Sequence, residues 1–249
     1  MGARLNDSLG QVPSVTLKIY NYKRMKKILL HLIFLLIVTG DLIGEYLQNS
    51  QIDHIFKPFL LIWIGGYFLI YARNIDRKVV QLATLGFLFS WGGDLFMMFA
   101  AEFVYFVLGI LFFLIAQVLY IFLFLRTINL SGKKPFLKKK PIWLIPYIAF
   151  GLIIYIILFP QLNIVLRIAI FIYIIAILTM SVMALNRYGN GHPISFSLVF
   201  AGSVFFVISD SMIAINRFLV SIPYEGIFIM TTYIAAQYLI MRGILKQYE

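Results

Sequence analysis

The chain has no cysteine and few charged residues. The first shortage excludes several kinds of site, and the second excludes a water-soluble protein. Without cysteine, disulfides, zinc–thiolate sites and cysteine nucleophiles are excluded. Charged residues make up only 12% of the 249 residues and hydrophobic residues 62%, with a mean hydropathy of +0.94. A water-soluble domain carries about a quarter charged residues, so this chain could not cover its surface with polar groups in water. The composition therefore predicts a protein of the lipid bilayer.

Long apolar runs predict an all-α fold. In a bilayer, the backbone N–H and C=O groups must be satisfied within helices or within a closed barrel. Runs of roughly twenty residues without alternating polarity suit helices rather than barrel strands. We therefore predict a polytopic bundle of about eight transmembrane helices. The expected spans are residues 28–47, 56–72, 79–99, 103–125, 142–159, 164–185, 194–215 and 226–245.

The spans form a single predicted transmembrane domain, residues 28–245. A polar tail, residues 1–27, precedes it and is expected to be flexible. Residues 246–249 form a short C-terminal tail. Neither tail nor any loop is long enough to suggest a separate soluble domain.

The basic residues predict the orientation of the bundle. All but three of the 21 Lys and Arg residues lie in the tails, or in or beside the loops that share a side with the N-terminus. Only Lys57, Arg167 and Arg217 lie toward the other face. Because cytoplasmic loops carry the excess of basic residues, both termini are predicted to be cytoplasmic. The net charge of +11 is attributed to these loops and to anionic lipid headgroups, not to nucleic-acid binding. The Ile-, Lys- and Phe-rich composition favours a bacterial inner membrane.

Four carboxylates fall within the predicted spans. Asp41 and Glu45 lie in the first span, Asp94 in the third and Asp210 in the seventh. An ionisable side chain at bilayer depth costs about 2.5–3.5 kcal/mol, so each is a functional candidate. The three spans run in the same direction, and each acid lies in the last third of its helix. The sequence therefore predicts one layer of acids near the outer face.

Further polar residues are expected to complete a cavity in this layer, open toward the outer leaflet. They are Lys57, Ser90, Asn216, Arg217 and Tyr233, with Gln117 and Gln237 as its floor. A single buried acid could instead form a structural ion pair, and a glutamine can simply join two helices. The clustering of several costly groups at one depth favours a functional site.

Several kinds of chemistry do not fit this layer. His31, His54 and His192 fall in separate regions and cannot converge on one metal or complete a Ser–His–Asp triad. The sequence has no Gly-x-Ser-x-Gly motif and no phosphate-binding glycine loop. The remaining expectation is carboxylate chemistry without a metal or a cofactor.

Short motifs around these acids resemble the YhhN-like membrane family, from about residue 28 to 245. The motifs are FSWGGD at 89–94, AQVLY at 116–120, VISDSMIAINRF at 207–218, YIAAQYL at 233–239 and the pair Lys57-Pro58. The Ser-Asp…Asn-Arg-Phe stretch is the most specific of them. The acids of the first span are less distinctive of the family.

The resemblance implies a lysoplasmalogenase, which hydrolyses the vinyl ether bond of a lysoplasmalogen. The products are a fatty aldehyde and glycerophosphoethanolamine or glycerophosphocholine. Protonation of the vinyl ether gives an oxocarbenium ion, so the site needs a proton donor and a stabilising carboxylate. We assign these two roles to Asp94 and Asp210, without deciding which donates. Lys57 and Arg217 would hold the phosphate of the lysophospholipid.

Two other classes stay open at this point. Acids within a membrane are equally typical of a proton-coupled transporter. A lipid-binding membrane protein without turnover would also use a polar cavity of this kind.

Overall fold

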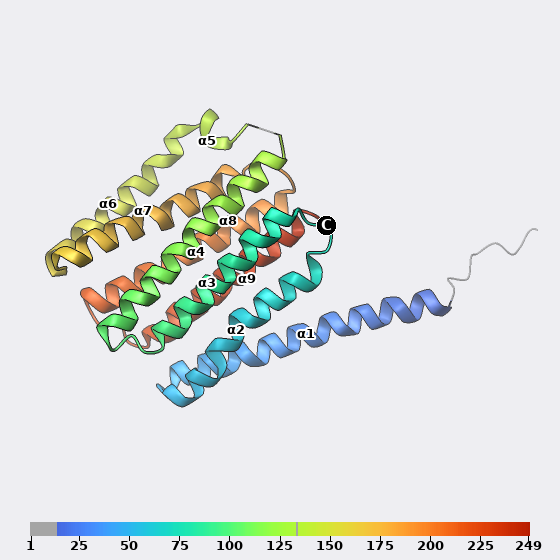
Figure 1. The fold of residues 1–249 in the computed structure, drawn as a ribbon, viewed down its shortest axis with the longest axis horizontal. Coiled ribbons are helices and arrows are strands. Elements are labelled where there is room, and N and C mark those ends of the chain that lie inside the picture. The colour runs from blue at the N-terminus through green and yellow to red at the C-terminus, as the bar shows by residue number, and fades with distance from the viewer. Residues whose placement is uncertain (1–13, 133) are drawn as a thin grey trace, which may run out of the picture. The chain divides into compact units, whose positions relative to one another are not determined.

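The computed structural model describes residues 14–132 and 134–249, and in these residues the chain is all-helical (Figure 1). The helices are α1 (Ser14–Tyr46), α2 (Ser50–Tyr71), α3 (Arg77–Met97), α4 (Phe103–Leu130), α5 (Phe136–Lys139), α6 (Ile145–Leu158), α7 (Ile164–Asn186), α8 (Pro193–Phe218) and α9 (Glu225–Lys246). Two 3-10 turns, η1 (Pro141–Leu144) and η2 (Phe159–Gln161), flank α6. Residues 37–249 form one compact unit, which contains all the site residues predicted above. Within the predicted N-terminal tail, residues 1–13 lie outside the described residues and residues 14–27 belong to α1.

Eight helices in the described part of the chain are long and apolar enough to cross a membrane. They confirm the predicted all-α, multi-pass architecture. The eight segments are Arg24–Tyr46, Ser50–Tyr71, Arg77–Met97, Phe103–Leu130, Pro141–Gln161, Ile164–Asn186, Pro193–Phe218 and Glu225–Lys246. Each predicted span falls on one of them, and most ends agree within a few residues.

The start of α2 departs most from the prediction. Lys57 and Pro58 were expected to open this span, but the helix begins at Ser50 and both residues lie inside it. The side chain of Asn49 caps the helix by accepting two backbone N–H groups of the first turn, at 3.0 and 3.3 Å. The first two turns of α2 carry several polar residues, so the hydrophobic pattern predicts this span only from residue 56.

The hairpins α3–α4 and α8–α9 pack closely because small residues lie at their interfaces. A Cβ atom at Gly86 would lie 2.6 Å from the ring of Tyr120 on α4. A Cβ atom at Gly202 would lie 2.8 Å from the backbone oxygen of Ala236 on α9. No side chain fits at either position, and this close approach brings the polar side chains of neighbouring helices within reach of one another.

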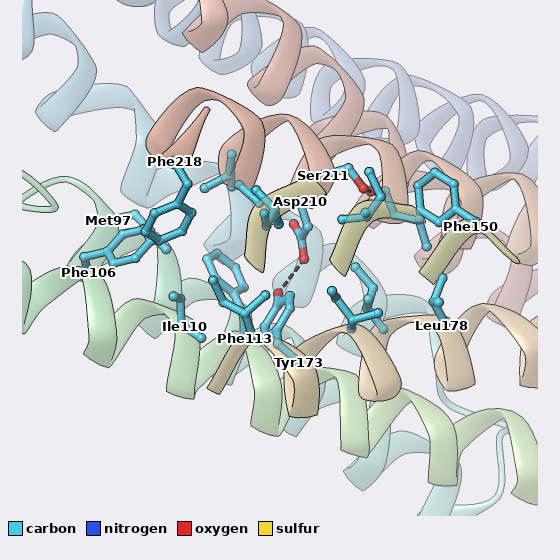
Figure 2. Close-up of a pocket in the computed structure, with 18 residues that line it drawn as sticks. Met97, Phe106, Ile110, Phe113, Phe150, Tyr173, Leu178, Asp210, Ser211 and Phe218 are labelled. Carbon is cyan, nitrogen blue, oxygen red and sulfur yellow. Dashed lines mark hydrogen bonds between the residues drawn. The ribbon is translucent and has the colours of Figure 1, made fainter. Parts of the chain in front are cut away.

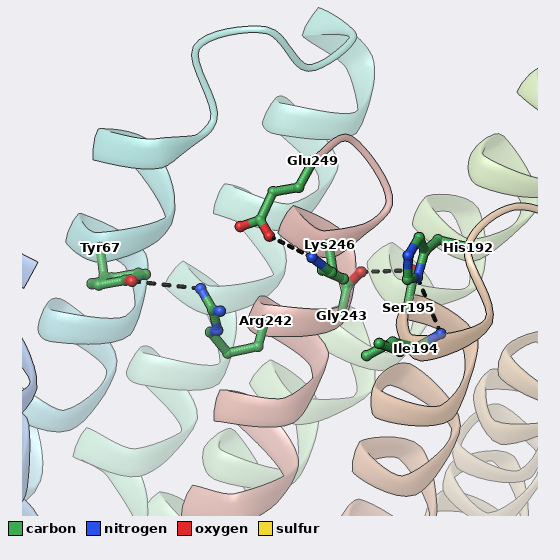
Figure 3. A network of polar contacts seen from close by, with 8 residues as sticks. All are labelled: Tyr67, His192, Ile194, Ser195, Arg242, Gly243, Lys246 and Glu249. Atoms are coloured by element: carbon green, nitrogen blue, oxygen red, sulfur yellow. Dashed lines mark hydrogen bonds and ion pairs between the residues drawn. The ribbon is translucent and has the colours of Figure 1, made fainter. Parts of the chain in front are cut away.

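Polar contacts also fasten the end of the bundle where α9 finishes and α8 begins (Figure 3). The hydroxyl of Ser195 on α8 donates to the backbone oxygen of Gly243 on α9 at 2.7 Å. It also accepts a hydrogen bond from the buried guanidinium of Arg187 at 2.9 Å. Arg242 on α9 donates to the hydroxyl of Tyr67 on α2 at 3.5 Å. These contacts join α2, α8 and α9 far along each helix from the acids.

Candidate active site

Six acidic or basic residues of the bundle line one cavity of about 260 Å³. They are Glu45, Lys57, Asp94, Asp210, Arg217 and Glu225. The lining comes from α2, α3, α4, α8 and α9, together with the last turn of α1. The sequence predicted the first five as site residues but did not single out Glu225.

Asp94 lies on α3 and is only 4% exposed. One of its carboxyl oxygens accepts a hydrogen bond of 2.9 Å from the hydroxyl of Tyr233 on α9. The ring of Tyr233 is fixed by edge-on contacts with Phe113 on α4 and Phe206 on α8, with ring centroids 5.9 and 5.6 Å apart. Three helices therefore determine where this carboxyl group points.

Asp210 lies on α8 and has a corresponding partner on another helix. The hydroxyl of Tyr173 on α7 donates to its Oδ2 atom at 2.5 Å (Figure 2). Gln117 on α4 lies beside the same tyrosine hydroxyl. The sequence did not predict Tyr173, which is surrounded by isoleucines in an apolar helix and belongs to none of the motifs. Both predicted catalytic acids thus accept a hydrogen bond from a tyrosine.

An apolar slot of about 70 Å³ adjoins the cavity. It lies between α4, α6, α7 and α8. Asp210 lines both spaces, and so do Met97, Phe106 and Phe113. Figure 2 shows Asp210 between the end of the slot near Phe106 and its other end near Leu178. This carboxyl group therefore marks the boundary between polar and apolar space.

A third space continues from the slot toward the surface of the bundle. It is an apolar groove of about 310 Å³ between α6 and α7. Ile174 and Leu178 line both the groove and the slot. The cavity, the slot and the groove thus follow one another, each sharing lining residues with the next.

Lys57 lines the cavity, but its positive charge is already paired with two carboxylates. Its Nζ atom lies 2.8 Å from Glu45 and 3.0 Å from Asp53, one turn earlier on α2. The indole N–H of Trp91 on α3 donates to the backbone oxygen of Pro58 at 2.9 Å and holds this part of α2 against α3. A phosphate at Lys57 would have to compete with two carboxylates. Lys57 is therefore a weaker phosphate ligand than the sequence suggested.

Four predicted site residues lie outside the cavity lining. Asp41, Ser90, Gln117 and Gln237 are each 0% exposed and are not among the residues that line the cavity. Gln237 accepts a hydrogen bond of 2.7 Å from the hydroxyl of Tyr120. The carboxyl oxygens of Asp41 and the amide of Gln117 make no hydrogen bond within the described residues. The expected floor, Gln117 and Gln237, therefore does not line the cavity, and both glutamines are buried between the helices.

Asn216 and Arg217 line the cavity at the end of α8. The side-chain oxygen of Asn216 accepts the backbone N–H of Ile222 at 2.9 Å and so holds the loop that follows. The guanidinium of Arg217 lies over the ring of Phe106, 4.9 Å from its centroid. Of these two predicted residues, Asn216 shapes the loop, and Arg217 offers a cation to the cavity.

No solved structure matches the chain. A family model described as the YhhN family matches residues 52–244. The matched region runs from the first turn of α2 almost to the end of α9, and it contains every cavity-lining residue except Glu45. This match confirms the resemblance found in the motifs. The chain belongs to the YhhN family.

Proposed function

We propose that this protein is a membrane-embedded hydrolase that cleaves the vinyl ether bond of a lysoplasmalogen. The products would be a fatty aldehyde and a glycerophospho-alcohol. The family includes lysoplasmalogenases, which gives the reaction class. The observation that carries the proposal is that Asp94 and Asp210 line one polar cavity, and that Asp210 also lines the apolar slot beside it.

The cavity, the slot and the groove, which share lining residues in turn, could hold the successive parts of a lysophospholipid. The polar headgroup and glycerol would lie in the cavity, and the first carbons of the chain in the slot. The rest of the chain would leave between α6 and α7 through the groove that begins at Ile174 and Leu178. The vinyl ether, where headgroup and chain meet, would then lie at Asp210.

The position of Asp210 favours it as the proton donor. Hydrolysis of a vinyl ether begins with protonation of its β-carbon, which is the second carbon of the chain. Of the two acids, only Asp210 lines the slot, so with the lipid bound as proposed it would lie beside this carbon. Tyr173 would hold that carboxyl group in the required orientation through its hydrogen bond.

Asp94 would then stabilise the oxocarbenium ion that forms on the first carbon. It lies in the polar cavity, where water can enter, and Tyr233 fixes its orientation. A water molecule would add to the first carbon and give a proton to Asp94. The hemiacetal then breaks its C–O bond to the glycerol. Asp94 would return its proton to the leaving glycerol oxygen, and the hemiacetal hydroxyl would give its proton to the Asp210 carboxylate, which leaves the aldehyde and the alcohol with both acids restored. The net reaction consumes one water molecule and no cofactor.

The test compares a lysoplasmalogen with its saturated ether analogue, using purified protein in detergent. We expect aldehyde from the first lipid only, and none above background from Asp94→Asn or Asp210→Asn. Glu102→Gln, which changes an exposed acid outside the cavity, is the matched control and should retain activity. In D₂O, the aldehyde should carry one deuterium on the carbon next to its carbonyl, because the proton donor exchanges with solvent.

Two results would remove this mechanism. One is full activity in both asparagine variants, which would show that neither carboxyl group takes part. The other is aldehyde formed in D₂O without deuterium on that carbon, which would exclude protonation of the double bond. An inactive but folded wild type that carries protons across liposomes would favour the transporter instead.

A further inference from the structure

Two opposite charges at the cavity have no charged partner. Arg217 and Glu225 both line it, and neither forms an ion pair with any residue of the described chain. They are also not paired with each other. By contrast, the lysine in the same cavity, Lys57, is held by two carboxylates. The cavity therefore offers one free cation and one free anion to a ligand.

The loop between α8 and α9 places both charges at the cavity. It follows the end of α8 at Phe218, one residue after Arg217, and leads into α9 at Glu225. Asn216 holds its centre through the hydrogen bond to the backbone of Ile222. At the end of the loop Tyr224 has a positive φ of 55°, a conformation that non-glycine residues seldom adopt. This loop conformation brings the backbone of both charged residues to the rim of the same cavity.

Contacts with the last turn of α1 support this conformation. The ring of Tyr224 stacks on that of Tyr46, with centroids 5.8 Å apart. Gly226 allows the carboxylate of Glu45 to approach, since a Cβ atom there would overlap it. The position of Glu225 is therefore set by neighbours on both sides.

We propose that Arg217 and Glu225 together select a lysolipid with a phosphoethanolamine headgroup. Arg217 binds the phosphate and Glu225 binds the primary ammonium group; that the ligand is a lysolipid rests on the function proposed above. A guanidinium donates parallel hydrogen bonds to phosphate oxygens, and a carboxylate accepts the N–H groups of an ammonium. A zwitterion satisfies both charges at once, whereas an anionic headgroup leaves Glu225 facing a like charge.

The surroundings of Glu225 favour ethanolamine over choline. Quaternary ammonium groups, which have no N–H donor, are recognised by cages of aromatic rings. Next to Glu225 on α9 the cavity is lined by Gly226, Ile229 and Met230. Its three aromatic residues are Phe106, Phe113 and Tyr233. Arg217 already lies over the ring of Phe106, and Phe113 and Tyr233 pack edge-on against each other beside Asp94, so these rings do not form a cage around Glu225.

The test measures binding and turnover separately. Binding uses saturated ether lysolipids, which the proposed reaction cannot cleave, with phosphoethanolamine, phosphocholine or phosphoglycerol headgroups. We expect wild-type protein to bind the phosphoethanolamine lipid most tightly. Glu225→Gln should lose about tenfold in affinity for that lipid, in line with the loss of one charged hydrogen bond, and little for the phosphoglycerol lipid. Arg217→Gln should weaken the binding of all three.

Two control variants separate selection from stability. Glu102→Gln removes an exposed acid at the start of α4, outside the cavity, and should change no affinity. Glu225→Asp keeps the charge and should restore part of the preference for phosphoethanolamine. Equal weakening of all three lipids in Glu225→Gln, or no change in any, would overturn the inference. Wild-type protein that binds with this selectivity but releases no aldehyde from vinyl ether lipids would overturn only the proposed hydrolysis.

Discussion

Tyr173 shows what the sequence could and could not reveal about single residues. Asp94 and Asp210 could be found because a charged side chain within an apolar helix is costly and needs a reason. A tyrosine carries no such cost and is common in membrane helices, so nothing in the sequence distinguished Tyr173 from the other fourteen tyrosines. Glu225 was overlooked for a different reason: it lies at a helix end, where an acid is ordinary. Partners of this kind become visible only when the packing of the helices is known.

Tyr173→Phe removes the hydroxyl group that donates to Asp210 and leaves the ring in place. A buried hydrogen bond to a charged or polar partner contributes about 1–3 kcal/mol, so kcat for vinyl ether hydrolysis should fall about ten- to a hundredfold. On the proposed mechanism KM should change little, because the hydroxyl would orient the acid and would not contact the headgroup. Steady-state assays with lysoplasmalogen, together with a thermal unfolding curve, measure both effects.

Tyr188→Phe is the matched control for this substitution. Tyr188 follows α7, is 56% exposed and lines neither the cavity, the slot nor the groove. The loss of its hydroxyl should leave kcat within about twofold of the wild type. A normal kcat in Tyr173→Phe would show that Asp210 needs no partner on α7.

At the scale of elements, the turn between α2 and α3 depends on one carboxylate. Asp76 caps α3 by accepting the backbone N–H of Val79 at 3.3 Å. It also accepts two hydrogen bonds from Arg126 on α4, at 3.2 and 3.1 Å. The hydrogen bonds from Arg126, followed by those from the α3 backbone, lower the pKa of Asp76 below its usual 3.8. The turn therefore ties α3 to α4 only while this carboxyl group is charged.

An acid whose pKa is lower in the folded protein than in the unfolded chain stabilises the fold at any pH above its ordinary pKa. This stabilisation is lost as the pH falls through the lowered pKa. The wild type should therefore have a higher Tm than Asp76→Asn at neutral pH. The difference should shrink once the pH drops below about 4, where Asp76 begins to bind a proton. Thermal unfolding of both proteins in detergent between pH 3 and pH 7 measures this. A difference that grows toward low pH would contradict the role given to Asp76.

The helices themselves were predictable because the bilayer leaves the backbone few choices. Long apolar runs had to be helices, and all eight were found. The start of α2 was predicted too late along the chain. Its first turns are polar, and they are helical because Asn49 caps them and Lys57 forms an ion pair with Asp53. Which residues of the acid layer line the cavity, and which are buried between the helices, could not be predicted from depth alone. It depends on the direction in which each side chain points around its helix.

At the scale of the whole molecule, the orientation of the bundle would decide which leaflet supplies lipid to the proposed hydrolase. The basic residues predict that α5 lies on the cytoplasmic side and the loop between α3 and α4 on the other. Ala100, in that loop, lines the cavity, so the cavity would receive lipids from the outer leaflet. An inverted bundle would take them from the cytoplasmic leaflet and release its aldehyde on that side.

The absence of cysteine makes this orientation directly measurable, because one introduced thiol is the only one in the chain. Ala101→Cys and Lys138→Cys place it at exposed positions on the two predicted sides. A membrane-impermeant maleimide applied to intact cells should label Ala101→Cys, and should label Lys138→Cys only after permeabilisation. Ala116→Cys places the thiol at a position that is 0% exposed, so it should react only after denaturation. This variant is the control for leakage of the reagent into the cells. Labelling of Lys138→Cys alone in intact cells would invert the bundle, and the proposed enzyme would then draw its lipid from the cytoplasmic leaflet while the chemistry at Asp94 and Asp210 stayed the same.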